Sequence, residues 1–241
     1  MKLKSILLGL FALSILATSC NKNEDVTPSN NVTTVDKTIT GYSQLNVSDP
    51  FKVYVTFSET EEKIQVEANS NLQQYITVEK QNNQLVIYVD DNVDIEGSAV
   101  LNVYITTKQL DAFYAAGAST IQLQNELNAT NVSINLSGAC TFSGNMFVNE
   151  LNTDLTGASN VNISGSANSV ELNATGSSNM SDYGFETNNF TCDLEGASNA
   201  YLTIKQNLNV AANGASNVYY KGDGVVSNQD LSGGSTIQKM N

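Results

Sequence analysis

Acidic side chains are the residues of this 241-residue chain best suited to chemistry, and the densest group is the run DDNVDIEG that begins at Asp90. Asp90, Asn92 and Asp94 have the spacing that opens a calcium-binding EF-hand loop. Ile95, however, occupies the position that requires glycine, and Leu101 stands where the twelfth loop residue should be glutamate. We therefore interpret this segment as a solvated acidic loop and expect no metal site there.

Asp154 and Asp193 form a second arrangement, because they occupy equivalent positions of a sequence repeat, two copies apart. If the copies stack as strands, the two carboxylates lie roughly 10 Å apart, which overlaps the wide end of the separation used by inverting glycosidases. Acidic residues that line a solvated strand face give the same spacing, and we favour that interpretation. The chain has no histidine, P-loop or dinucleotide fingerprint, so histidine-dependent catalysis is excluded and no cofactor is expected.

A short glycine-containing pattern must position these residues, since it recurs seven times in the second half of the chain. Its copies read GAST, GACT, GASN, GSSN, GASN, GASN and GGST, and they begin at Gly117, Gly138, Gly157, Gly176, Gly196, Gly214 and Gly233. The intervals between these glycines are 21, 19, 19, 20, 18 and 19 residues. A period of this length predicts a solenoid, in which each repeat buries its apolar side against the next.

Apolar and polar residues alternate on both sides of each glycine, which predicts two strands per repeat, each with one buried face. Around Gly176, for example, the apolar positions are Val170, Leu172 and Ala174 before the glycine and Met180 after it. The glycine between the strands is expected to form a corner that needs positive φ or a close backbone approach.

Equivalent residues of successive repeats should stack about 4.8 Å apart, so recurring polar residues become ladders. One such column holds serines, and the next holds Asn160, Asn179, Asn199 and Asn217. Stacked amides can hydrogen-bond along the stack, and we interpret these columns as structural. A polar strip that binds glycans is the functional alternative. Tyr201 and Tyr219 occupy equivalent outward positions near this strip, where tyrosines can contact sugars or simply cover the sheet.

The repeat length drifts between 18 and 21 residues, so the strict hexapeptide rhythm of left-handed β-helices is absent. Because parallel strands joined by crossovers are overwhelmingly right-handed, we predict an all-β, right-handed parallel β-helix of about seven rungs. Residues 38–110 are strand-rich without the pattern, and we expect irregular strands or a meander that caps or continues the solenoid. Gln81 to Gln84 is a plausible hairpin turn. No Pro/Gly-rich linker separates this part from the regular repeats at 111–241, so residues 38–241 are expected to form a single domain.

The beginning of the chain is typical of an export signal. Residues 1–19 combine two lysines, a short apolar run and the sequence Leu16-Ala17-Thr18-Ser19-Cys20, whose small residues before cysteine resemble a bacterial lipobox. We expect Cys20 to carry the lipid, palmitate included, as the first mature residue; an ordinary secretory signal is the alternative. The following Asn21-Lys22-Asn23-Glu24-Asp25 resembles the signal that sends Bacteroidetes-type lipoproteins to the outer face of the outer membrane. Residues 20–37 are polar and predict a flexible tether.

Composition limits the partners further. The net charge is −13 and arginine is absent, which argues against nucleic acid as a ligand. The only membrane contact that we expect is through the lipid. Cys140 and Cys192 lie two to three rungs apart, beyond disulfide reach, so we predict two free, buried thiols used for packing.

The signal with Cys20, the strand-rich region from Thr38 and the recurring Gly-Ala-Ser-Asn turns together resemble the GIN-domain family, the auto-transporter adhesin head domain of Bacteroidetes surface lipoproteins. The resemblance covers about residues 38–235. It implies a right-handed β-helix, a surface location and an adhesive or scaffolding role, with no catalytic residues to carry over.

Two functional hypotheses follow. The first is a non-enzymatic, lipid-anchored surface protein whose rigid face binds a glycan or a protein partner. The alternative is a polysaccharide-processing enzyme on the same scaffold. A cleft with converging carboxylates favours the enzyme, and a smooth surface favours binding.

Overall fold

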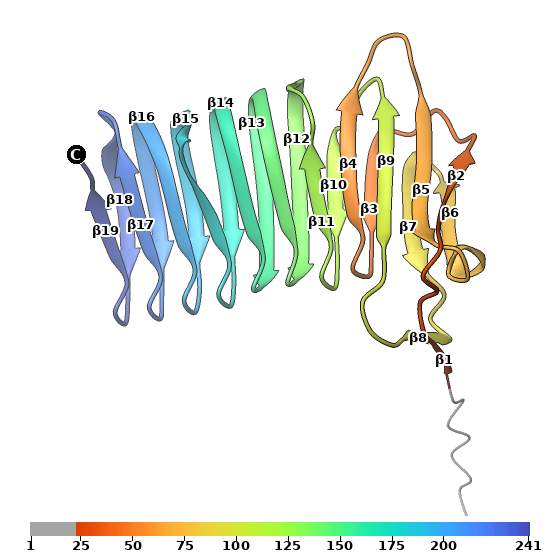
Figure 1. The fold of residues 1–241 in the computed structure, drawn as a ribbon. Helices are drawn as coiled ribbons and strands as arrows, with labels where there is room; N and C mark the ends of the chain where they lie inside the picture. Colours follow the sequence, from red (N-terminus) through yellow and green to blue (C-terminus); the bar gives the residue numbers. More distant parts are fainter. Residues whose placement is uncertain (1–22) are drawn as a thin grey trace, which may run out of the picture.

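The computed structural model describes residues 23–241, which form an elongated rod of stacked strands (Figure 1). Cys20 and the expected signal peptide lie outside the described residues. Most strands belong to one continuous 17-stranded sheet that coils along the rod, and a short parallel pair, β1 (Glu24–Val26) and β8 (Val93–Ile95), lies at its N-terminal end. The helical part of the described chain is one short 3-10 turn, Gln73–Tyr75.

Long strands follow most of each coil, and each pairs in parallel with the strand one repeat later. They are β12 (Leu127–Gly138), β13 (Thr141–Gly157), β14 (Asn160–Ala174), β15 (Asn179–Leu194) and β16 (Asn199–Ala212). Their register follows the sequence repeat, since Asn160 pairs with Asn179 and Leu172 with Cys192. The predicted all-β parallel solenoid is therefore confirmed.

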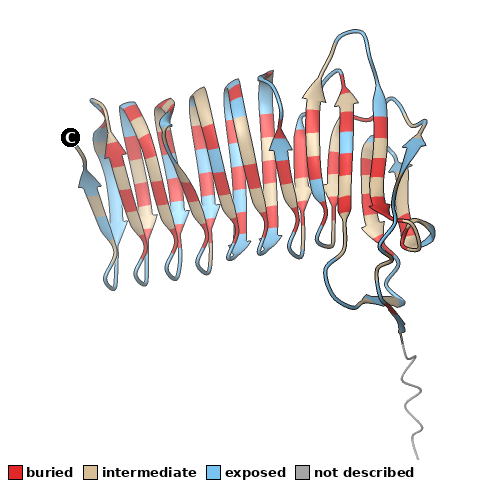
Figure 2. Ribbon diagram, viewed as in Figure 1, coloured by how far each residue is buried: buried red, intermediate tan, exposed pale blue. Residues whose placement is uncertain are grey.

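Shorter strands begin and end the regular part. The first are β10 (Ala112–Ala115) and β11 (Thr120–Leu123), and the last are β17 (Asn217–Lys221), β18 (Val225–Leu231) and β19 (Thr236–Lys239). Apolar side chains from every rung form one core along the rod, and buried and exposed residues alternate along the strands (Figure 2). The predicted inward column is buried throughout: Val132, Leu151, Val170, Phe190 and Leu208. Burial of these side chains is the main stabilising contribution to the stack.

Two more rungs precede the repeats, and the chain visits them out of order. β3 (Gln44–Val47) and β4 (Lys52–Phe57) pair in parallel with β10 and β11. β7 (Gln84–Val89) and β9 (Leu101–Thr107) lie on the far side of β3 and β4, again in parallel. In sequence order, the rung of β3 and β4, which adjoins the repeats, comes first. The rung of β7 and β9, at the N-terminal end of the rod, comes second. The chain then returns to the other side of β3 and β4, where β10 begins the repeats.

Antiparallel strands close the N-terminal end. β5 (Lys63–Asn69) covers β9, and β6 (Ile76–Gln81) covers β7. The irregular region therefore both continues and caps the solenoid. The predicted hairpin turn is confirmed, since Gln81 pairs with Gln84 across it.

The structure corrects the predicted tether in the part of it that is described. β2 (Val32–Lys37) pairs antiparallel with β5 along its whole length, and Ser29 is held by a 2.8 Å hydrogen bond from its amide to Asn71 Oδ1. No residue of β2 is buried. An edge strand that contributes nothing to the core has no apolar alternation, which is why its composition indicated a tether.

Candidate binding face

Each regular repeat turns at its glycine, and the turn is locked to the rung before it. Gly176 has φ +86°, and a Cβ at this position would lie 2.4 Å from the carbonyl oxygen of Gly157. Two residues later, the buried Ser178 hydroxyl donates to the Thr175 carbonyl oxygen at 3.1 Å and accepts from the Ser159 amide at 3.3 Å. The corner therefore needs glycine for space and serine for polar satisfaction.

The four asparagines of the repeat lie in one line on the outside of the strands that follow the glycines. The Nδ2 groups of Asn179, Asn199 and Asn217 each donate to the Oδ1 atom of the preceding asparagine, at 3.0, 2.9 and 3.0 Å. The same Nδ2 groups also donate to backbone carbonyl oxygens within their own turns. Each Oδ1 atom already accepts one hydrogen bond, from the next asparagine or, at Asn217, from the Thr236 hydroxyl. Because both amide hydrogens are used and each oxygen can accept a second bond, the column can form an acceptor stripe.

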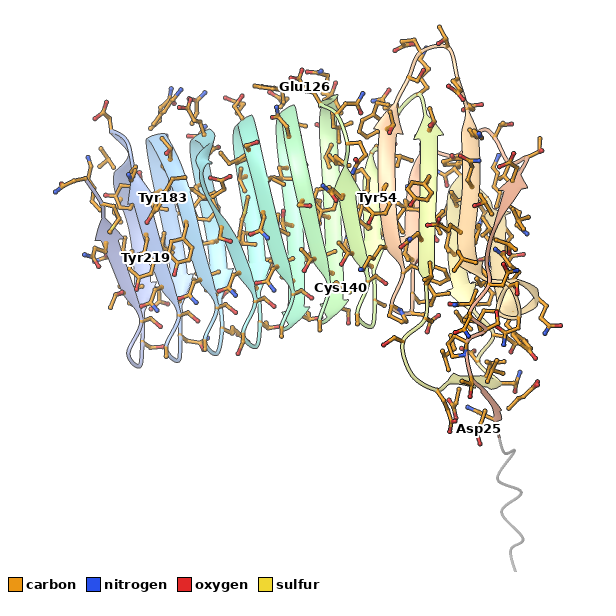
Figure 3. All side chains as sticks on the ribbon, in the orientation of Figure 1. Asp25, Tyr54, Glu126, Cys140, Tyr183 and Tyr219 are labelled. Carbon is orange, nitrogen blue, oxygen red and sulfur yellow. The ribbon has the colours of Figure 1, made fainter. Side chains whose placement is uncertain are left out.

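Tyr201 and Tyr219 lie in the next outward column of the same strands. Their rings stack with centroids 5.0 Å apart and an angle of 14° between the planes. A third ring, that of Tyr183, meets Tyr201 edge-on, with a centroid distance of 6.0 Å and an angle of 88°. Lys221 Nζ lies 5.1 Å from the centroid of the Tyr183 ring, within cation–π range. Figure 3 labels Tyr183 and Tyr219 towards the C-terminal end of the rod.

Sequence reasoning missed Tyr183 because β15 bulges between Ser181 and Glu186, where the pairing with β16 shifts register. A bulge re-aims side chains, and here it brings an additional ring beside the tyrosine column. The available signal was the interval of 20 residues from Gly176 to Gly196, which is longer than the 18 that follow it.

The tyrosine hydroxyls are free to meet a ligand. Among residues 23–241, the hydroxyls of Tyr201 and Tyr219 make no hydrogen bond to another group. Burial raises the pKa of Tyr201, and its two tyrosine neighbours add to the effect. At neutral pH the hydroxyl is therefore an uncharged donor and acceptor.

The two broad faces of the rod differ in charge. We define the neutral face as the outward side of β11, β17, β19 and the first residues of β13 to β16. Over these segments, from Thr120 to Lys239, the carboxylates belong to Asp182, in the bulge of β15, and to Glu186, which pairs across the strands with Thr203 and forms an ion pair with Lys205. The other face, made by the strands before the glycines, carries Asp154, Asp193 and Asp230 in one column.

The carboxylates considered for catalysis do not converge. Asn173 lies between Asp154 and Asp193 in their column, and its Nδ2 donates to Asp154 Oδ1 at 2.9 Å. Asp154 lines a shallow hollow with Tyr114, whereas Asp193 lines a different one with Asp230. The arrangement is that of acidic residues on a solvated sheet.

The acidic loop that begins at Asp90 is stabilised by hydrogen bonds within the loop itself. Asp90 accepts hydrogen bonds from the backbone and side-chain amides of Asn92, at 3.0 and 2.8 Å, and these bonds lower the pKa of its carboxyl. The residues that follow form β8. Over residues 23–241, no group of three or more His, Cys, Asp or Glu side chains could hold a metal ion.

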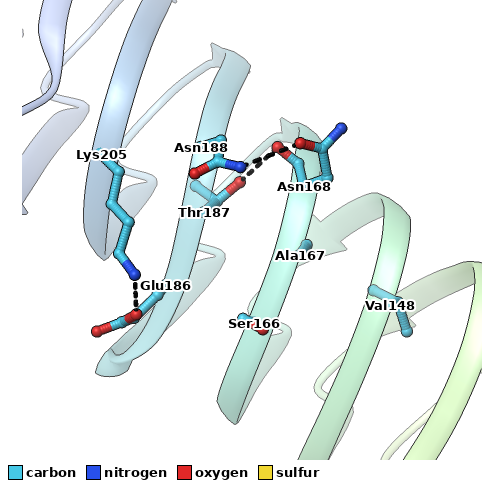
Figure 4. A pocket seen from close by; sticks show the side chains of 8 residues that line it. All are labelled: Val148, Ser166, Ala167, Asn168, Glu186, Thr187, Asn188 and Lys205. Atoms are coloured by element: carbon cyan, nitrogen blue, oxygen red, sulfur yellow. Dashed lines mark hydrogen bonds and ion pairs between the residues drawn. The ribbon is translucent and has the colours of Figure 1, made fainter.

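A hollow on the narrow side of the rod is lined by side chains that bind one another (Figure 4). Glu186 pairs with Lys205, and Asn188 Nδ2 donates to Asn168 Oδ1 at 3.1 Å. The polar groups that form these pairs are already satisfied. The hollow is therefore a weaker candidate than the neutral face.

Both described cysteines are buried and free, as predicted. Burial raises the pKa of Cys140, and it raises that of Cys192 to about 12. Because the thiolate is the nucleophile, neither thiol is suited to covalent catalysis.

A rod of parallel coils with glycine corners, one column of buried serines and a continuous apolar core defines a β-solenoid repeat protein. The chain belongs to the family described as "Putative auto-transporter adhesin, head GIN domain", whose model matches residues 41–224. None of the curated proteins is significantly similar to it. The described part of the chain contains no helix long and apolar enough to cross a bilayer.

Several solved structures share this fold. A putative adhesin from Bacteroides fragilis is 20% identical, with a TM-score of 0.80 over 89% of this chain and 100% of that one. A putative adhesin from Parabacteroides merdae is 21% identical, with a TM-score of 0.67 over 90% and 100% of the two chains. A protein from Parabacteroides distasonis described as a putative lipid binding protein is 16% identical, with a TM-score of 0.74 over 90% and 100%. At these identities the likeness shows the fold.

Proposed function

We propose that the chain is a non-enzymatic surface adhesin that binds a glycan or protein partner through its neutral face. The observation that carries this proposal is the cluster of Tyr183, Tyr201 and Tyr219, whose rings contact one another on the neutral face of a strongly acidic protein. Tyrosines supply a large contact area with little loss of side-chain entropy on binding. Membership of an adhesin-head family supports the same function.

The anchor that we propose is a lipid on Cys20, which would hold the protein at the exterior of the outer membrane. The described chain begins beside β1, at the capped end of the rod (Figure 1). A lipid at this end would leave the regular repeats and the tyrosine cluster pointing away from the membrane. Palmitate labelling in cells should be lost in Cys20→Ala and retained in the matched variant Cys140→Ala. Equal labelling of both variants would contradict the anchor.

Binding through the neutral face can be tested with the full chain, purified in detergent and coated on beads. Bead capture on mucin, matrix proteins and immobilised glycans should fall in the double variant Tyr201→Ala/Tyr219→Ala. Tyr114→Ala is the matched control, since it removes a tyrosine from the other face. Capture that is unchanged by the double variant on every surface contradicts the proposed function.

The enzyme alternative makes a different prediction. Release of reducing sugars from polysaccharides, lost in both Asp154→Asn and Asp193→Asn, would favour it. The separate hollows of these two carboxylates are the reason that we expect no such release.

A further inference from the structure

We infer that the neutral face, together with the outward side of β4 and β9 that continues it beyond β11, binds one extended chain of uncharged sugars. The sugar chain lies along the axis of the solenoid and contacts tyrosines at two separate stations. The first station is the cluster of Tyr183, Tyr201 and Tyr219. The second is the pair Tyr54 and Tyr104, near the N-terminal end. This inference rests on the proposed function and names the ligand class for the same face.

The two stations belong to one outward column. Tyr54 and Tyr104 pair directly across β4 and β9, and their rings stack with centroids 5.1 Å apart and 13° between the planes. The Tyr104 hydroxyl donates to Glu67 Oε2 at 3.1 Å, so this station carries one carboxylate. From Tyr54 the strand pairing leads through Gln122, Ser143 and Asn162 to Ser181, Tyr201 and Tyr219. At the bulge the column stays connected, because Ser181 Oγ donates to Asn162 Oδ1 at 2.6 Å. Tyr54 is labelled on the N-terminal part of the rod in Figure 3.

Between the stations the column holds only shorter polar side chains: Gln122, Ser143, Asn162 and Ser181. Five rung steps separate Tyr54 from Tyr201, which is roughly 24 Å at the usual strand spacing of about 4.8 Å. A low polar strip with a tyrosine pair at each end fits a long, narrow ligand. A compact ligand would reach one station alone.

The chemistry of the face matches sugar hydroxyls. The asparagine stripe runs beside this column from Asn162 to Tyr219, and each of its Oδ1 atoms, which already accepts one bond within the protein, can accept a second from a hydroxyl group. The stacked rings cover one another, so Tyr201 and Tyr219 meet a ligand with their edges and hydroxyls. Tyr183 is turned by 88° and carries the Lys221 ammonium over its ring, and a flexible lysine can move aside for a sugar ring.

The charge and hydrophobicity of the face favour an uncharged polysaccharide over a polyanion or a protein partner. A net charge of −13 disfavours a polyanion, and the neutral face has no cluster of lysines to offset it. Protein interfaces centre on tryptophan, tyrosine and arginine, and the chain has no tryptophan or arginine to add to its tyrosines. Of the large hydrophobic side chains that are exposed in the described chain, Tyr104 is the one in this column. None of these objections applies to an uncharged polysaccharide.

The test uses the full chain in detergent, immobilised and titrated with malto-, cello-, manno- and xylo-oligosaccharides, each as disaccharide and hexasaccharide. Polygalacturonate is the anionic comparison. We expect at least one hexasaccharide to bind and its disaccharide to bind at least about tenfold more weakly, because two linked contacts reinforce each other. Tyr201→Ala and Tyr54→Ala should each weaken the hexasaccharide about tenfold, while Tyr114→Ala leaves it unchanged. Tyr201→Phe keeps the ring and removes only the hydroxyl, so it separates the contributions of the two groups to binding. An unfolding midpoint of Tyr201→Ala equal to that of the wild type shows that its loss of binding does not come from misfolding.

Three results would overturn the inference: no neutral series binds, polygalacturonate binds better, or Tyr54→Ala has no effect on the hexasaccharide. The bead assay separates this failure from failure of the proposed function. If capture on a protein or acidic glycan still depends on Tyr201 and Tyr219, the neutral face is an adhesive surface with another ligand. If no capture depends on these residues, both proposals fail.

Discussion

The amide of Ser159 donates a 3.3 Å hydrogen bond to the hydroxyl of Ser178, one rung further along the buried interior of the rod. The same link joins Ser178 to Ser198 and Ser198 to Ser216, at 3.3 and 3.2 Å. A backbone amide at each corner is thus satisfied by the next repeat. Stacking is therefore specified by polar groups as well as by apolar burial.

Ser178→Ala should destabilise the protein by about 1–3 kcal/mol, because it leaves the Ser159 amide and the Thr175 carbonyl oxygen without this partner inside the rod. The neighbouring exposed residue Ser177 is the matched control, and other repeats carry alanine at its position. Urea unfolding measures both variants. Equal stability of Ser178→Ala and Ser177→Ala would show that the serine column is dispensable.

Gly176→Ala and Gly117→Ala should differ although both glycines have positive φ. A Cβ at Gly117 finds its nearest atom, the Asp49 nitrogen, at 3.4 Å, whereas at Gly176 it meets the Gly157 oxygen at 2.4 Å. We expect about 1–2 kcal/mol for Gly117→Ala, from backbone strain alone. Gly176→Ala should cost at least about 2 kcal/mol more, since the rungs must also separate. Thermal unfolding compares the two, and indistinguishable midpoints would contradict the steric role of this corner.

The regular repeats were predictable because residues at the same position of successive repeats lie next to each other in neighbouring strands. The apolar columns and the pairing of Asn160 with Asn179 follow from counting residues from each glycine. The N-terminal rungs were hidden because Asp49 fills the glycine position there. Asp49 has φ +67°, and its carboxylate accepts the Val89 amide at 2.9 Å. An aspartate that adopts the left-handed region and is held by a bond to a distant strand leaves no GASN signature.

The neutral face was only partly predictable for a similar reason. Tyr201 and Tyr219 share a column position, so their contact follows from the period. Tyr183 reaches them through a bulge, and a local change of register cannot be read from a repeat that assumes constant register. That Tyr54 belongs to the same column could not be predicted, because this depends on the order in which the N-terminal strands pair.

Thiol labelling should distinguish native from unfolded protein sharply. Burial holds the pKa of Cys192 at about 12, so at pH 8 its thiolate fraction is roughly a thousandfold below that of an exposed thiol. In the variant Cys20→Ala, the native protein should therefore react very slowly with iodoacetamide, and both remaining thiols should react in urea. Rapid labelling of Cys192 in the native state would contradict its buried position.

The same thiol predicts a loss of stability at alkaline pH. The pKa of Cys192 is raised from an ordinary value near 9 to about 12, so the unfolded chain loses this proton first. The contribution is fully present below pH 9 and falls as pH rises towards 12, by at most about 1.4 kcal/mol per pH unit. Cys192→Val has no thiol at this position and therefore lacks this pH-dependent contribution. Burial also raises the pKa of Tyr42 to about 12, but Tyr42 is present in both proteins, so its effect cancels in the comparison. The difference in unfolding free energy between wild type and Cys192→Val should therefore depend on pH above 9 and not below it.

Removal of β2 should convert the protein from a monodisperse species to a self-associating one. β2 covers the outer edge of β5, and its pairing satisfies backbone groups from Ile64 to Asn69. Without it, β5 presents an open edge that can pair with another chain. A variant that lacks residues 1–37 should form concentration-dependent oligomers in light scattering, whereas the matched variant that lacks residues 1–22 should not. The loss of burial itself should be small, because no β2 residue is buried and Val26 of β1 is the one buried residue among those from 23 to 37 that the deletion removes. Oligomers in both variants would show that self-association does not use the β5 edge. Oligomers in neither variant would show that β5 does not need β2 to prevent self-association.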